Sequence, residues 1–141
     1  MESLTLDQAT RTVEAALAAA RREGFKPMAI VVLDEAGQLK HVAREDAATP
    51  LRVDIAHGKA AAAFGMGIAS RALQERASAN PVFFNAIAPA CGGKFIAQAG
   101  AVAIVATSGR LIGAIGASGG TGDEDEAVCV EGLRAVGLAH R

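Results

Sequence analysis

The chain has 141 residues, enough for one domain with a single buried core, and we expect residues 1–141 to form that domain. Its 14 basic and 15 acidic residues give a net charge of −1, which excludes the one-sided positive surface that a nucleic acid partner requires. Its apolar runs are shorter than the roughly 18 residues of a membrane span, and its first residues lack the pattern of a signal peptide, so we expect a cytoplasmic protein without a membrane partner.

The first predicted helix begins after Thr5. Thr5 and Gln8 have the spacing of a capping box, in which each side chain bonds the backbone amide of the other residue, and Leu4 is placed for a hydrophobic staple. Apolar residues then recur at helical spacing as far as Gly24, which ends the helix. One face of this helix is therefore expected to cover the core.

A β-hairpin is predicted next. The continuous apolar run 28–33 is followed by a turn at 34–37, with Asp first and Gly fourth, and by a looser alternation over 38–45.

A second helix is predicted from Thr49, as the N-cap, with Pro50 at the first helical position, to about Phe64. A short third helix starts at Ser70 and is broken at Asn80-Pro81.

The segment after this break is strongly apolar, and its Phe83 and Phe84 are predicted to form a pocket lid or a contact between subunits. Hydrophobic residues make up 51% of the chain, which is high for a small domain and also favours self-association.

The last third of the chain carries three strand candidates, at 94–98, 101–106 and 111–117. Asp123 is predicted to cap a final helix whose first turn is acidic, where the positive end of the helix dipole favours acids. Hairpins at both ends of the chain indicate an antiparallel sheet with helices packed on it, which is the α+β class.

Four stretches carry a resemblance to a known family: residues 34–48, residues 54–64, the pair Gly92-Gly93, and the long glycine-rich and acidic stretch 109–127. In these the chain resembles the GlcG/HbpS-like proteins, which include the C-terminal domain of the PduO cobalamin adenosyltransferases. The resemblance implies a profilin-like α/β/α domain with a five-stranded antiparallel sheet flanked by helices. It further implies assembly into dimers or larger rings, haem binding in some members, and accessory roles in catabolism in others.

The resemblance also implies a set of ligand-binding residues, carried over where this sequence matches the family pattern: Arg44, Asp46, Lys59, Gly119, Gly120 and Asp125. The sequence departs from the PduO-type domain at one place. The iron-binding histidine of the first helix is missing, since residues 5–24 contain no histidine.

The stretch Gly113–Ala127 has neither the lysine ending of a P-loop nor the spacing of a dinucleotide fingerprint. Its glycines are expected to turn the chain while the acids cap a helix; alternatively, Gly119 and Gly120 line a pocket, with Asp125 pointing inward.

Lys59 lies among alanines on a helix that is expected to be buried. A buried lysine is costly unless it is paired or reaches a cavity, and Asp46 or Asp125 would be its partner. Alternatively, its stem lies on apolar surface with the charged end in water.

Of the three histidines, His41, His57 and His140, His57 is the candidate axial ligand if haem binds, and no other metal site is expected. Cys91 and Cys129 fit reduced thiols rather than a disulfide or a zinc site.

The sequence thus predicts an oligomeric protein that binds haem or a small oxygenated acid between the second and last helices and the sheet. An alternative is a cofactor-independent lyase or isomerase that acts on a small carbonyl or carboxylate intermediate, using Lys59 with Asp46 or Asp125. A third hypothesis is a structural accessory subunit.

Overall fold

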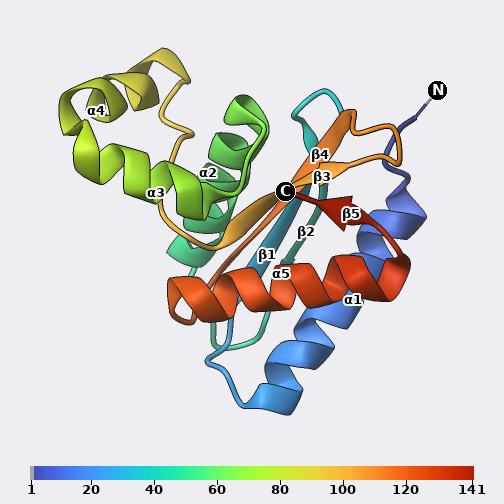
Figure 1. Cartoon of the computed structure of the whole chain (residues 1–141). Coiled ribbons are helices and arrows are strands. Elements are labelled where there is room, and N and C mark those ends of the chain that lie inside the picture. The colour runs from blue at the N-terminus through green and yellow to red at the C-terminus, as the bar shows by residue number, and fades with distance from the viewer. Residues whose placement is uncertain (1) are drawn as a thin grey trace.

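The computed structural model describes residues 2–141, which form five helices around a five-stranded antiparallel sheet, and this confirms the predicted α+β class (Figure 1). The helices are α1 (Leu6–Glu23), α2 (Leu51–Met66), α3 (Ser70–Ala79), α4 (Pro81–Ala90) and α5 (Gly122–Val136). The strands are β1 (Ala29–Leu33), β2 (Leu39–Arg44), β3 (Ala101–Val105), β4 (Leu111–Ser118) and β5 (Ala139–His140), in the spatial order β2-β1-β4-β3-β5.

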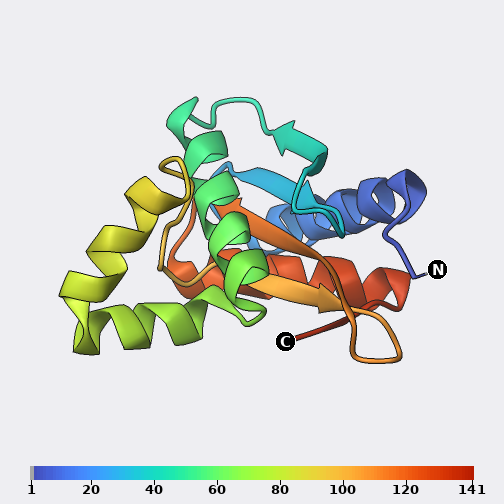
Figure 2. The ribbon, with the colours of Figure 1, turned by 90° about the horizontal axis from the view of Figure 1, so that it is seen from above.

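Helices cover both faces of the sheet. Alternate residues of β1 point to opposite faces, so that Ile30 and Val32 pack with α1 and α5 while Val31 and Leu33 pack with α2. Figure 2 shows α1 and α5 side by side on one face and α2 on the other. A strand buried on both faces explains why β1 reads as a continuous apolar run rather than an alternation.

The contact between α2 and β4 is unusually close. A Cβ atom on Gly116 of β4 would lie 2.5 Å from the carbonyl oxygen of Ala56, so only glycine permits this approach. The alanine-rich face of α2 therefore lies directly on the centre of the sheet.

Two of the three helix caps expected from the sequence differ in the structure. The capping box of Thr5 and Gln8 is present, as predicted. At α5 the cap is Thr121 rather than Asp123: Thr121 Oγ1 accepts from Glu124 N at 3.1 Å, and Glu124 Oε1 accepts from Thr121 N at 3.0 Å. Thr121 and Glu124 repeat the Thr-x-x-acid pattern of a capping box, which leaves Asp123 inside the first turn.

At α2 the predicted Thr49 cap is wrong. Pro50 is the N-cap residue and already has helical dihedral angles, with φ −56° and ψ −35°. Within residues 2–141 no side chain caps this end, and the carbonyl oxygen of Thr49 accepts from Arg52 N at 3.1 Å.

The fifth strand is not the predicted one. Residues 94–98 have no regular secondary structure, with a bend at Gln98, and Ile96 N donates to Gly58 O of α2 at 3.0 Å. This segment crosses α2, so it cannot reach an edge of the sheet. The edge is instead completed by β5, in which His140 pairs with Ile104 of β3.

The helices α3 and α4 form an arm that projects from the body of the molecule, above and to the left in Figure 1. The break at Asn80-Pro81 is confirmed, but the apolar segment after it forms a further helix, α4, with Pro81 in its first turn. No residue of α4 is buried, and the exposed fractions of Val82 and Phe83 are 82% and 53%. No helix among residues 2–141 is long and apolar enough to cross a membrane.

Candidate functional site

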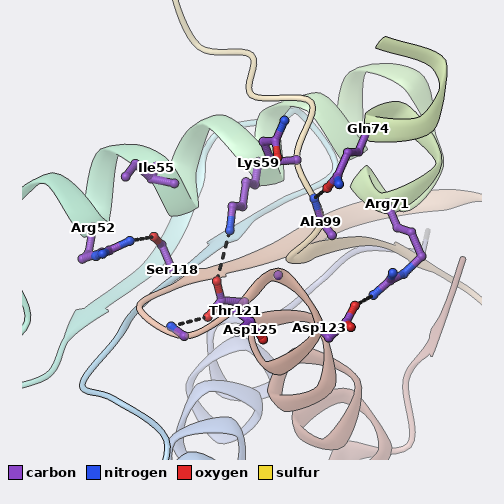
Figure 3. Close-up of a pocket in the computed structure, with 13 residues that line it drawn as sticks. Arg52, Ile55, Lys59, Arg71, Gln74, Ala99, Ser118, Thr121, Asp123 and Asp125 are labelled. Carbon is purple, nitrogen blue, oxygen red and sulfur yellow. Dashed lines mark hydrogen bonds and ion pairs between the residues drawn. The ribbon is translucent and has the colours of Figure 1, made fainter. Parts of the chain in front are cut away.

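A hollow of about 390 Å³ lies where the face of α2, the end of β4 and the first turn of α5 meet (Figure 3). One wall comes from α3 and the segment before β3. We call it the Lys59 hollow; its lining residues are Arg52, Ile55, Lys59, Arg71, Gln74, Gln98, Ala99, Ser118, Gly120, Thr121, Gly122, Asp123 and Asp125.

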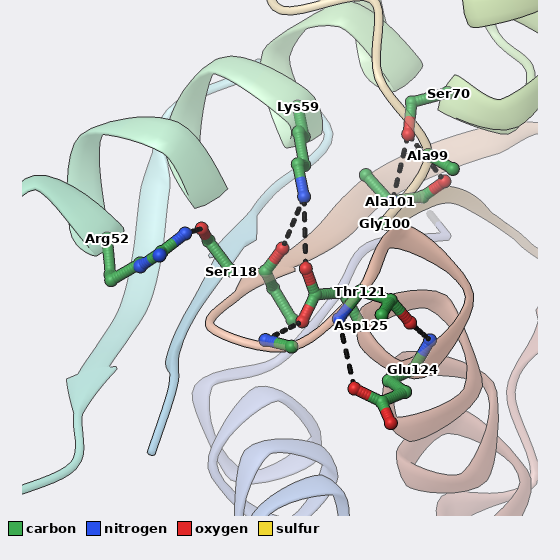
Figure 4. Close-up of polar contacts among 12 residues, drawn as sticks. Arg52, Lys59, Ser70, Ala99, Gly100, Ala101, Ser118, Thr121, Glu124 and Asp125 are labelled. Atoms are coloured by element: carbon green, nitrogen blue, oxygen red, sulfur yellow. Dashed lines mark hydrogen bonds and ion pairs between the residues drawn. The ribbon is translucent and has the colours of Figure 1, made fainter. Parts of the chain in front are cut away.

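A buried ion pair lies in this hollow. Lys59 Nζ is 3.1 Å from Asp125 Oδ2 and donates to Ala117 O at 3.2 Å (Figure 4). The exposed fractions of Lys59 and Asp125 are 6% and 1%, so the pair is almost fully removed from water. The structure thus gives Lys59 a partner, and that partner is Asp125.

The pair is packed under Gly100, just before β3. A Cβ atom at Gly100 would lie 2.6 Å from Lys59 Nζ and 3.1 Å from Asp125 Cβ, and φ at this residue is +135°. A side chain at this position would displace the Lys59 ammonium, and this φ is strained for any residue other than glycine. Glycine therefore lets the backbone pack directly against the two charges.

The glycine-rich loop turns the chain and also lines the Lys59 hollow, so its two predicted roles are compatible. Gly120 N donates to Asp125 Oδ1 at 2.9 Å, which holds the second carboxylate oxygen. A Cβ atom on Gly119 would lie 2.4 Å from Pro27 O, so this residue is fixed by close packing against the segment before β1.

Arg52 is a charged member of the site that the sequence did not predict. It lies on the same face of α2 as Ile55 and Lys59, and its Nη1 donates to Ser118 Oγ at 3.2 Å. Among residues 2–141 it forms no ion pair with a carboxylate. The i, i+3, i+7 spacing from Arg52 to Lys59 is the signal that could have found it.

Arg71 forms the wall on the α3 side. It pairs with Asp123 and with Glu126, whose Oε2 is 3.1 Å from Arg71 Nε. Its charge is thus balanced by two acids near the start of α5, in contrast to that of Arg52.

Arg44 and Asp46 lie elsewhere. They line a separate hollow beside Arg21, Pro27 and Glu45, at the outer end of β2. Arg44 Nη1 donates to Ala48 O at 2.7 Å, and Asp46 is exposed. The structure therefore brings Lys59, Gly120 and Asp125 together, with Gly119 adjoining them, and does not bring Arg44 and Asp46 to them.

None of the three histidines lines the Lys59 hollow. His57 is half-buried on another face of α2; burial, and then the charge of Lys94, lower its pKa below the ordinary value. His41 Nδ1 lies 3.3 Å from Thr10 Oγ1, and His140 is exposed on β5.

The two cysteines do not contribute to the hollow either. Cys129 is buried, which raises the pKa of its thiol, and Cys91 is exposed. Within residues 2–141, no group of three or more His, Cys, Asp or Glu side chains is placed to hold a metal ion.

The lining of the hollow decides which chemistry it can hold. Apart from glycines, only Ile55 and Ala99 among its residues have purely apolar side chains, and none is a histidine, cysteine or methionine that could ligate iron. The ammonium of Lys59 and the guanidinium of Arg52 suit a carboxylate. The hollow therefore fits a carboxylate, including a haem propionate, but not the apolar ring or the iron of haem.

Comparison with known proteins gives a consistent result. A family model described as "Haem degrading protein HbpS-like" matches residues 4–134. Among curated proteins, none matches the chain.

Three solved structures show how far the similarity extends. A double mutant of HbpS from Streptomyces reticuli is 27% identical, with a TM-score of 0.81 over 96% of this chain and 88% of that one. A complex of PduOC with haem is 22% identical, with a TM-score of 0.86 over 96% of each chain. The Klebsiella pneumoniae protein ORFY is 21% identical, with a TM-score of 0.87 over 97% of this chain and 92% of that one. The last two likenesses show the fold alone.

Proposed function

Because the chain belongs to the HbpS-like family, whose model spans residues 4–134, we propose that it is a small-ligand-binding protein whose ligand carries a carboxylate. The ligand occupies the Lys59 hollow. The observation that carries this proposal is the buried Lys59–Asp125 pair with Arg52 beside it, which forms no ion pair within residues 2–141.

The buried pair is better explained by function than by stability. Removing two charges from water costs several kcal/mol per ion, and a well-packed apolar pair of similar size is often at least as stable. An ammonium group has three N–H donors, and two acceptors, Asp125 Oδ2 and Ala117 O, account for two of them. The third donor is available to an oxygen atom of a ligand.

Arg52 supplies the second contact. Its guanidinium has five donors, of which one bonds Ser118, and the others can bind a carboxylate in bidentate geometry. Lys59 donates to the carbonyl oxygen of Ala117, and Arg52 donates to the hydroxyl of the next residue, Ser118. Both cations therefore lie against the same short stretch of β4.

Haem is the second candidate ligand, favoured by the name of the family and by the haem complex of the PduOC relative. The residues of the Lys59 hollow would hold a propionate only. His57, the proposed axial ligand, is half-buried on a different face of α2, so a haem with its iron on His57 would bind outside the Lys59 hollow. A bound haem would supply redox chemistry at its iron.

Self-association is the second part of the proposal. The α4 surface, made of the ten residues Pro81–Ala90, has no charged side chain and no buried residue, and the T-shaped pair Phe83 and Phe84 lies on it. A second copy of the chain is the proposed occupant of this surface, and an accessory role in a catabolic pathway would be compatible with such an assembly.

The test is a pair of titrations on the wild type, one with haemin, followed in the visible spectrum, and one with short carboxylic acids, followed by calorimetry. The variants are Lys59→Met, the double variant Lys59→Met/Asp125→Asn, which leaves no unpaired buried charge, and His57→Gln, with Lys40→Met as the control for loss of a lysine. We expect the acids to bind the wild type and Lys40→Met and to lose at least tenfold in affinity in both Lys59 variants.

Three other outcomes are informative. A saturating haemin spectrum that changes in His57→Gln would support haem as ligand. Conversion of a carbonyl acid that Lys59→Met abolishes would support the lyase or isomerase. No binding of either ligand class would contradict the proposal and leave the structural accessory subunit.

A further inference from the structure

A second hollow, of about 410 Å³, adjoins the first. We call it the Lys26 hollow; its lining residues are Gly24, Phe25, Lys26, Arg52, Gly119, Gly120, Thr121 and Glu124. Arg52, Gly120 and Thr121 line both hollows. The two hollows therefore meet at Arg52, Gly120 and Thr121, and we refer to them together as the groove.

The charges along this groove do not cancel. Its basic residues are Lys26, Arg52, Lys59 and Arg71, and its acidic residues are Asp123, Glu124 and Asp125, so the groove has a net charge of 4 − 3 = +1 in a chain of net charge −1. The first turn of α5 adds the partial positive charge of a helix N-terminus.

Each acid of the groove already has a partner within the protein. Asp125 binds Lys59, Asp123 binds Arg71, and Glu124 accepts from Thr121 N in the capping box. Arg52 and Lys26, by contrast, form no ion pair with any carboxylate of residues 2–141. Two cations without an ion pair thus lie in the second hollow beside one carboxylate, that of Glu124, which leaves a net charge of +1 there, and one of the two cations also lines the first hollow.

From this we infer that the ligand is a dianion, a linear dicarboxylic acid whose two ends occupy the two hollows. One carboxylate binds the third N–H of Lys59, the other lies beside Lys26, and Arg52 donates to both from between them. This inference rests on the proposed function and adds the substrate class. Since Lys59 lines only the first hollow and Lys26 only the second, with Arg52 lining both, a flexible chain such as glutarate or adipate fits better than oxalate, whose two carboxylates are directly joined.

The test is calorimetric titration of the wild type with saturated monocarboxylates and with dicarboxylates of the same carbon number. The second carboxylate should tighten binding at least tenfold. Lys26→Met should remove this preference while leaving the affinity for monocarboxylates unchanged. Lys26 is exposed, so its replacement leaves the core intact, and Lys40→Met, outside both hollows, should behave as the wild type.

Two results would overturn the inference: equal affinity for the two acid series, or a dicarboxylate preference that survives Lys26→Met. If monocarboxylates still bind in a way that depends on Lys59, the proposed function stands and only the dianion is wrong. If neither series binds the wild type, the proposed function fails as well.

Discussion

At the scale of single residues, the site depends on a charge pair that is costly to bury. Lys59→Met leaves the Asp125 carboxylate buried without its cation and should lower the free energy of unfolding by about 3–5 kcal/mol. Lys59→Met/Asp125→Asn removes both charges and keeps an oxygen for Gly120 N, so it should regain most of that loss. Urea unfolding at pH 7 measures the free energy of unfolding of both variants. If Lys59→Met were as stable as the wild type, this would contradict the buried ion pair.

His57 provides a prediction about pH. Burial lowers its pKa in the folded chain below its value of 6.5 in the unfolded chain, so the unfolded state binds the proton more tightly. The resulting stability is fully present above pH 6.5 and is lost as the pH falls through the lower, folded pKa. The free energy of unfolding should therefore drop between pH 7.5 and pH 5.5, by less in His57→Gln than in the wild type. Equal pH dependence of the two proteins would refute the conclusion that burial lowers the pKa of His57.

Residue by residue, the sequence predicts the site only where a single position is unusual. Lys59 stands out because a lysine among alanines needs a partner, and Asp125 because it follows a glycine-rich turn. Arg52 does not stand out, since an arginine near the start of a helix is ordinary on the surface. Arg44 and Asp46 are close in sequence to a strand end, but β1 lies between β2 and β4, and this separates them from Lys59.

At the scale of elements, the cap of α5 positions the first turn that lines both hollows. Thr121→Ala removes the side-chain acceptor for Glu124 N and should cost about 1 kcal/mol, within a usual range of roughly 0.5–2. Asp123→Ala, the matched control, keeps the cap and loses a surface ion pair with Arg71, worth about 0–1 kcal/mol, together with the interaction of one acid with the helix dipole. Thermal unfolding of the two variants gives the comparison, and a larger loss in Asp123→Ala would reverse the assignment of the cap.

Elements that carry a local signal were predictable, and those fixed by distant contacts were not. The first helix and the hairpin have a capping box and an Asp-to-Gly turn within a few residues. Segment 94–98 looks like a strand, yet its backbone bonds α2 because Gly58 leaves room there for Ile96. The two residues of β5 are too few to give any periodicity, and they become a strand only by pairing with β3.

At the scale of the whole molecule, the arm formed by α3 and α4 exposes apolar surface that a single copy of the chain does not cover. Val82→Asp/Phe83→Asp places two charges on the α4 surface. If a second copy occupies this surface, light scattering should give an oligomer for the wild type and a monomer for the double variant. The melting temperature of the isolated chain should not change, since both side chains are exposed. An unchanged mass would remove α4 as the interface.

The most direct test of the ligand site is a map of amide chemical shifts, recorded while the wild type is titrated with glutarate. The largest shifts should fall on Ser118, Gly120 and Gly122, which border the Lys59 hollow, and should be absent in Lys59→Met/Asp125→Asn. Shifts centred instead on α4 or around Arg44, or no saturable shifts at all, would contradict the assignment of this hollow as the ligand site.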